Sequence, residues 1–94
     1  MFEIVVSCRG VSEQAALDCL DDLLREFAER PWQTAVRCRW ENGQIFLHVR
    51  NDYDSTGQAV LDEFSDAICA CVPIEVANIS FAVESVAAVT GRDA

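Results

Sequence analysis

The segment from Thr34 to Arg50, TAVRCRWENGQIFLHVR, decides the fold. Apolar and polar side chains alternate on both sides of Asn42-Gly43, as they do along half-buried strands. Asn-Gly is strongly preferred in a two-residue type I′ turn, which needs positive φ at both central positions. The segment therefore predicts a β-hairpin with strands over residues 33–40 and 44–50.

A two-residue turn also determines which residues face one another across the hairpin. Glu41 is then opposite Gln44, and the side chains on the inward face of both strands are apolar. We expect the inward pairs Trp40–Ile45, Cys38–Leu47 and Val36–Val49, and the outward pairs Arg39–Phe46, Arg37–His48 and Ala35–Arg50.

The flanking sequence predicts one strand and one helix on each side of the hairpin. Before it, we predict a strand over 2–8 and a helix over 13–30; after it, a helix over 56–71 and a strand over 74–84 that could extend to 89. The order strand, helix, strand, strand, helix, strand predicts an α+β, ferredoxin-like split βαβ sandwich. This fold has a four-stranded antiparallel sheet in the order 4-1-3-2, with two helices on one face.

The same patterns predict the caps and the core. Ser12 is a suitable N-cap for the first helix, and Ser55 with Gln58 fits a capping box at the second. The side chains expected to point inward are Leu17, Leu20, Leu24 and Phe27 with Ala16, Leu23 and Ala28; Leu61, Phe64, Ile68 and Cys71 with Val60 and Ala67; and Ile79, Phe81 and Val83. We expect one domain over residues 1–90 and a frayed tail over 91–94.

The charge of the chain is strongly negative. Sixteen acids and seven basic residues give a net charge of −9. Such a charge disfavours nucleic acid and anionic membranes, so neither is expected as a partner. Residues 13–30 hold six acids and two arginines, and residues 52–66 hold five acids and no base, so these two segments account for the whole net charge.

The cysteines and the N-terminal residues suggest a cytoplasmic protein. Five cysteines, an odd number, lie within apolar runs, which favours reduced, buried thiols over a secreted disulfide framework. The first residues lack the features of a signal peptide, and no run approaches the length of a membrane-spanning helix. Cys69 and Cys71 are two apart on a predicted helix, so they should point in different directions.

One loop weakly resembles a calcium-binding loop. Asp52, Asp54, Thr56 and Glu63 occupy positions 1, 3, 5 and 12 of such a loop, with Gly57 at position 6. The loop follows a strand, however, and a helix that starts at Ser55 would begin too early for calcium binding. The alternative is that the two aspartates stabilise a helix N-terminus. We expect no cofactor, and no metal site beyond this weak candidate.

A cluster is expected on the open face of the sheet, formed by Arg37, Arg39, Phe46, His48 and Arg50. Arginine with an aromatic side chain is typical of some single-stranded RNA readers, but those proteins place further aromatics on the central strands. The simpler interpretation is that the arginines protect an edge strand. This face could also contact an acidic surface, including the helices of a second copy.

Catalytic candidates are weak, and no catalytic residue is proposed. Cys8 precedes a helix N-terminus beside Arg9, but it falls on the apolar face. His48 is the only histidine, and no nucleophile with an orienting carboxylate is expected beside it. Enzyme activity remains the weakest of the hypotheses.

We therefore expect a non-catalytic interaction protein that binds a basic protein partner, in the manner of small antitoxin, immunity or regulatory proteins. Its binding surface would be an acidic helix face formed by Asp18, Asp21, Asp22, Glu26, Asp62, Glu63 and Asp66. The alternative is a homodimeric regulatory domain that binds a small molecule or metal ion at the sheet interface or in the 52–63 loop. The last strand is apolar and lies at a sheet edge, so it or the open sheet face would form the dimer contact.

Overall fold

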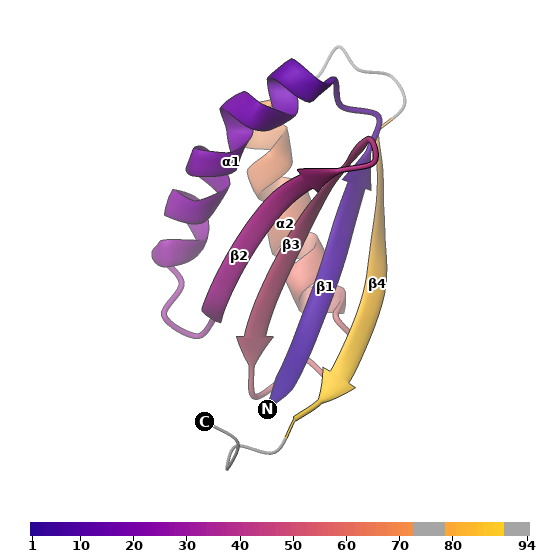
Figure 1. Cartoon of the computed structure of the whole chain (residues 1–94). Coiled ribbons are helices and arrows are strands. Elements are labelled where there is room, and N and C mark those ends of the chain that lie inside the picture. Colours follow the sequence, from indigo (N-terminus) through magenta and orange to yellow (C-terminus); the bar gives the residue numbers. More distant parts are fainter. Residues whose placement is uncertain (73–78, 90–94) are drawn as a thin grey trace.

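The computed structural model describes residues 1–72 and 79–89 of the 94-residue chain. Within these ranges, two helices and four strands follow one another in the predicted order (Figure 1). Their bounds are β1 (Phe2–Arg9), α1 (Glu13–Ala28), β2 (Thr34–Glu41), β3 (Gln44–Asn51), α2 (Gln58–Cys71) and β4 (Ser80–Ala88). The predicted start of the last strand, residues 74–78, and the predicted tail lie outside the described residues.

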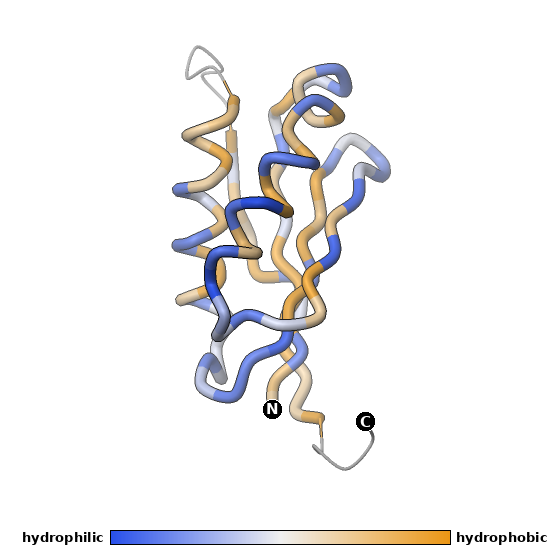
Figure 2. The backbone as a smooth tube through the Cα atoms, turned by 90° about the vertical axis from the view of Figure 1, so that its left-hand side faces the viewer, coloured by the Kyte–Doolittle hydropathy of each residue, from blue (hydrophilic) through white to orange (hydrophobic). Residues whose placement is uncertain are grey.

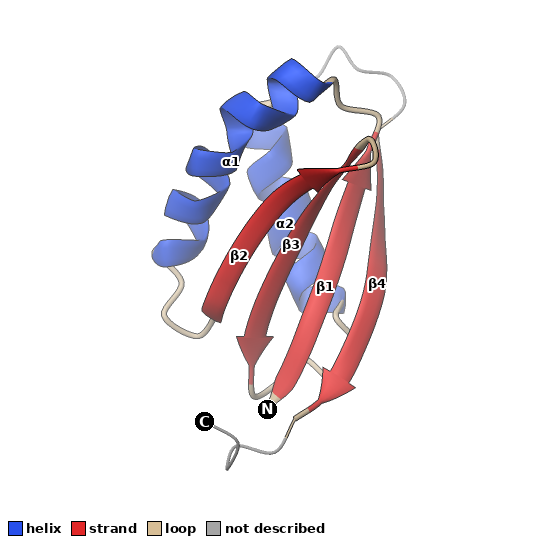
Figure 3. Cartoon of the chain, viewed as in Figure 1, coloured by secondary structure: helices blue, strands red, loops and turns tan. Residues whose placement is uncertain are grey.

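The strands form one antiparallel sheet in the order β2-β3-β1-β4, which is the predicted order read from the opposite edge. Both helices cover the same face of the sheet (Figure 3). A view turned by 90° shows the helices and the sheet as two separate layers (Figure 2). Neither of the two described helices is long and apolar enough to cross a membrane.

The hairpin register is confirmed along most of its length. Glu41, Trp40, Cys38, Arg39 and Arg37 face the predicted partners on β3. The turn residues Asn42 and Gly43 have φ angles of 51° and 77°, which a type I′ turn requires.

The predicted register is wrong at the start of β2. Thr34, not Ala35, lies opposite Arg50, because a register shift separates Thr34 from Arg37. Ala35 and Val36 occupy this irregularity, and Ala35 has a φ of 52°. An extra residue of this kind forms a β-bulge, which alternation of side chains alone does not reveal.

The core lies between the sheet and the helices. Its largest fully buried side chains include Phe27, Phe64, Ile4, Leu23, Ile45, Leu47 and Ile68. Phe81 and Val83 of β4 and Ile79 just before it pack against this core as predicted, and so does Val86. The inward residues Val83 and Val86 of β4 are three positions apart rather than two, because the pairing with β1 shifts by one residue. Val6 faces Val83, whereas the neighbouring Val5 faces Ser85.

The predicted inward face of α1 is confirmed at Ala16, Leu20, Leu23 and Phe27 and is wrong at Leu17, Leu24 and Ala28, which are exposed. Leu17 and Leu24 are 48 % and 39 % exposed. The buried residues of this helix are Ala16, Cys19, Leu23 and Phe27. Leu17 and Leu24 share helical spacing with Leu20 and Phe27, so periodicity alone did not exclude them from the inward face. The predicted stripe left out Cys19, which is buried and is joined to Cys71 of α2.

The capping-box prediction for α2 is also wrong. The helix begins at Gln58, and its N-cap is Gly57, which has a φ of 80° and no side-chain cap. The Asp54 carboxylate replaces the cap: Oδ1 accepts a hydrogen bond from the Gly57 amide at 3.0 Å and Oδ2 one from the Val60 amide at 2.9 Å. A Cβ at Gly57 would lie only 2.8 Å from Val83 Cγ1, so the position requires glycine for space as well as for its φ. At α1, by contrast, the Ser12 cap is confirmed by a 3.2 Å bond from the Ala15 amide.

The expectation of five reduced thiols is wrong. Cys19 of α1 and Cys71 of α2 form a disulfide, with their Cα atoms 5.8 Å apart. Cys8 is buried, Cys38 is partly buried and Cys69 is exposed, and these three are free. Cys69 and Cys71 do point in different directions, as their helical spacing predicts.

Candidate functional site

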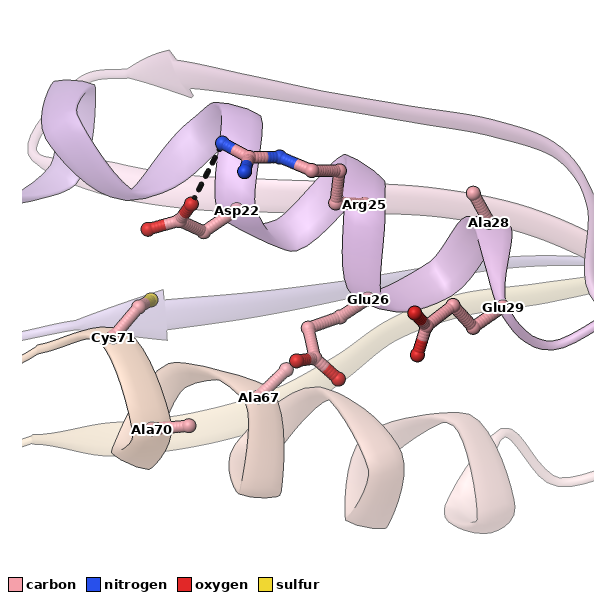
Figure 4. Close-up of a pocket in the computed structure, with 8 residues that line it drawn as sticks. All are labelled: Asp22, Arg25, Glu26, Ala28, Glu29, Ala67, Ala70 and Cys71. Atoms are coloured by element: carbon pink, nitrogen blue, oxygen red, sulfur yellow. Dashed lines mark hydrogen bonds and ion pairs between the residues drawn. The ribbon is translucent and has the colours of Figure 1, made fainter.

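A groove of about 520 Å³ runs between the two helices. We call it the helix groove. It is lined by Asp22, Arg25, Glu26 and Ala28 of α1, by the C-cap residue Glu29 that follows α1, and by Ala67, Ala70 and Cys71 of α2 (Figure 4). The Cys19–Cys71 disulfide joins the two helices at one end of this groove, so their separation there is covalently set.

The walls of the helix groove are acidic on the α1 side. Figure 4 shows the Glu26 side chain extending toward Ala67 of α2 and the Glu29 side chain, just after α1, lying in the space between the helices. Asp22 forms an exposed ion pair with Arg25 at 3.0 Å, and Glu26 lies 3.4 Å from Arg30. Glu29 has no ion-pair partner within residues 1–72 and 79–89. The α1 wall therefore presents more carboxylate than guanidinium charge.

The α2 side of the groove is small and apolar. Ala67 and Ala70 face the acidic side chains, and they leave room that a larger side chain would fill. A groove with carboxylates on one wall and methyl groups on the other suits a lysine or arginine side chain, whose stem is apolar and whose end is charged.

The structure brings only part of the predicted acidic helix face into the groove. Asp22 and Glu26 line it, whereas Asp18, Asp21, Asp62 and Asp66 are exposed outside it. Glu29 was missed as a site residue. Its spacing of three from Glu26 and seven from Asp22 places all three on one side of α1, and this spacing could have identified it.

Glu63 is committed to contacts within the chain. It is 2.9 Å from the Arg30 guanidinium, and it accepts hydrogen bonds from Gln33 at 2.7 Å and from the Trp32 indole at 3.2 Å. Its side chain is only 20 % exposed. Glu63 therefore anchors the α1–β2 connection to α2 rather than presenting a free carboxylate.

The residues of the weak calcium-like loop are not brought together as metal ligands. Asp54 is 5 % exposed and accepts the two backbone bonds at the start of α2. Thr56 lies 3.5 Å from the same carboxylate, Asp52 is exposed, and Glu63 points to Arg30. Over residues 1–72 and 79–89, no three His, Cys, Asp or Glu side chains group into a possible metal site.

The predicted sheet-face cluster does form on β2 and β3. The Arg39 guanidinium lies over the Phe46 ring, 4.5 Å from its centroid, and its Nη1 contacts Nε2 of His48. Arg39 also pairs with Glu41 at 3.1 Å, and Arg50 pairs with Glu3 at 2.8 Å. Arg37 has no ion-pair partner in the described part of the chain.

Burial and the neighbouring guanidinium groups of Arg39 and Arg37 lower the pKa of His48, against a smaller opposing effect of Glu3. Because arginine only donates hydrogen bonds, Nε2 of His48 acts as the acceptor in its contact with Arg39. Burial and the two arginines therefore favour the neutral form of the His48 imidazole over its protonated form.

The buried thiol of Cys8 is poorly suited to nucleophilic chemistry. Burial raises its pKa to about 11, and Cys69 adds a smaller effect in the same direction. Burial likewise raises the pKa of Cys38, with a further contribution from Asp21. A thiolate is the reactive form of cysteine, so both side chains are held in the unreactive form.

No protein-family model, curated protein or solved structure matches this chain.

Proposed function

We propose that this chain is a non-catalytic interaction protein whose helix groove binds a cationic segment of a basic protein partner. The observation that carries the proposal is the pair of glutamates, Glu26 and Glu29, that extend over the Ala67 and Ala70 side of a groove of about 520 Å³. We also propose the ferredoxin-like class for the fold, supported by the order of the elements and of the strands.

The charge distribution supports a basic partner. All of the net charge of −9 is carried by residues 13–30 and 52–66, which include both helix N-termini and most of α1 and α2. An acidic surface of this kind accelerates the encounter with a cationic protein, and the acceleration falls steeply as salt is added. The exposed acids Asp18, Asp21, Asp62 and Asp66 would act mainly at this stage, because they lie on the helices outside the groove.

The groove would supply the close contacts. A lysine or arginine stem packs against Ala67 and Ala70, while its charged end meets the carboxylates of Glu26 and Glu29. Arginine suits this position best, because its planar fork makes two hydrogen bonds to a carboxylate.

The test uses an arginine-rich peptide as the probe and isothermal titration calorimetry at two salt concentrations. Glu26→Gln/Glu29→Gln should weaken binding about tenfold and reduce the salt dependence, since two carboxylate contacts are lost. Glu13→Gln/Glu41→Gln removes the same charge outside the groove and should weaken binding much less. Equal losses in the two double variants would mean that only the net charge matters and would contradict the groove assignment.

A second candidate is a homodimeric regulatory domain that uses the last strand and the open sheet face. The observation that favours it is the edge position of β4, which carries the exposed small residues Ala82, Ser85 and Ala87. Small side chains permit the close approach of another sheet, and an edge strand has unpaired backbone groups on one side.

A further inference from the structure

We propose that the open face of the sheet carries a binding site for a small oxyanion, a phosphate or carboxylate group, formed by Arg37, Arg39 and His48. This site is separate from the helix groove, since it lies on the face of the sheet that the helices do not cover (Figure 3). It does not depend on the proposed basic partner.

The first observation is a pair of adjoining hollows on this face. One, of about 330 Å³, is lined by Glu3, Ala35, Val36, Arg37, His48, Val49 and Arg50. The other, of about 220 Å³, is lined by Arg37, Cys38, Arg39 and His48. Arg37 and His48 line both hollows, so a ligand that contacts these two side chains could occupy either hollow or both.

The second observation is an uncompensated positive charge at Arg37, where the two hollows meet. Arg50 is neutralised by Glu3 at 2.8 Å, and Arg39 is paired with Glu41 at 3.1 Å. Arg37 is exposed and has no carboxylate partner among residues 1–72 and 79–89. A guanidinium without a carboxylate partner can donate two parallel N–H hydrogen bonds to a phosphate or carboxylate, and proteins commonly use arginine in this way.

The third observation is the geometry that holds these groups. Arg37 lies directly opposite His48 in the hairpin, and Arg39 is held over Phe46, 4.5 Å from the ring centroid. The bulge at Ala35 and Val36 lies immediately before Arg37 and borders the larger hollow. Bulges of this kind re-aim side chains and are frequent next to functional sites. The three groups are therefore held side by side on two paired strands.

His48 gives the site an internal reporter. The groups that face it are Arg37 and Arg39 of β2, which lower its pKa together with burial, and Glu3 of β1, which opposes them. An anion bound between the two arginines offsets their charge and adds an acceptor, so it should raise the pKa of His48. His48 is the only histidine in the chain, which makes its ring resonances unambiguous.

The experiment is an NMR titration of the His48 ring with sodium phosphate, repeated with sodium succinate and with sodium chloride at matched ionic strength. We expect saturable shifts and a raised His48 pKa with phosphate or succinate, and neither with chloride. The tighter of the two ions identifies the phosphate or the carboxylate group as the preferred ligand. Identical behaviour in all three salts would overturn the proposal.

Variants locate the site. Arg37→Gln should weaken the binding of the ion at least tenfold, the loss expected for one charge-assisted contact. Arg9→Gln removes the same charge from the same face, at the hairpin-turn end of β1, and should leave the affinity unchanged. Equal affinity in Arg37→Gln and the unmodified protein would overturn the assignment. Shifts of the His48 ring that depend on protein concentration without added ion would overturn it in favour of a second copy on this face.

Discussion

At the scale of single residues, Asp54 shows why a short motif can suggest the wrong chemistry. An aspartate at a calcium-ligand position and an aspartate that binds a helix N-terminus look alike in sequence, because both use carboxylate oxygens. The structure assigns both oxygens to backbone amides of Gly57 and Val60. The left-handed Gly57, rather than Ser55, makes this arrangement possible.

Asp54→Ala should lower the free energy of unfolding by about 2 kcal/mol, because two amides at the start of α2 would lose their acceptors. Asp52→Ala should change it by less than about 0.5 kcal/mol, since Asp52 is exposed. Urea denaturation in the presence of a chelator measures both. A loss in Asp54→Ala that appears only when calcium is present would instead support the calcium-binding hypothesis.

At the scale of elements, the sequence predicted the parts of the fold that local chemistry determines. Asn42-Gly43 sets the hairpin turn, and Ser12 caps the start of α1. The bulge at Ala35 was not predictable from alternation, because no glycine or proline marks it. The inward face of α1 was predicted too wide, because Leu17 and Leu24 extend its apolar surface beyond the part that is buried.

The Cys19–Cys71 disulfide could not be predicted either. The two residues are 52 positions apart, and only the packing of α1 against α2 brings them together. The helix groove was partly predictable. The spacing of Asp22, Glu26 and Glu29 places them on one side of α1, but that Ala67 and Ala70 lie opposite follows from how the two helices pack.

Removing the disulfide should destabilise the chain substantially. In the chain-entropy description, a cross-link that closes a loop of this length contributes about 4 kcal/mol. Cys19→Ala/Cys71→Ala should therefore lower the free energy of unfolding by about that amount, measured in urea, while Cys69→Ala should change it little because Cys69 is exposed. Alkylation of all five cysteines in protein prepared without reductant would show that the bond does not form.

At the scale of the whole molecule, the two layers differ in charge. The helix layer holds the acidic residues around the groove, and the opposite face of the sheet holds the arginines around His48. The two proposed sites therefore lie on opposite faces and select ligands of opposite charge. The net charge of −9 is the sum over the whole chain and does not reveal this difference in charge between the two faces.

The second candidate function makes its prediction at this scale. If β4 and the open sheet face form a homodimer, light scattering should give twice the chain mass at micromolar concentration. Ala87→Arg, which places a long charged side chain on the exposed face of β4, should raise the dimer dissociation constant at least tenfold. Gln14→Arg on α1 should leave it unchanged. A monomer at every concentration would contradict the dimer.

The disulfide also has a mechanical consequence. It closes a covalent ring from residue 19 to residue 71, which encloses β2, β3 and most of both helices, while β1 and β4 lie outside the ring. Tension applied to the two ends of the chain would separate β4 from β1 and β1 from β3. The force would then reach the ring at Cys19 and Cys71 and pass through the sulfur–sulfur bond. The hairpin and the arginine cluster on it would therefore be shielded from stretching for as long as this bond remains oxidised.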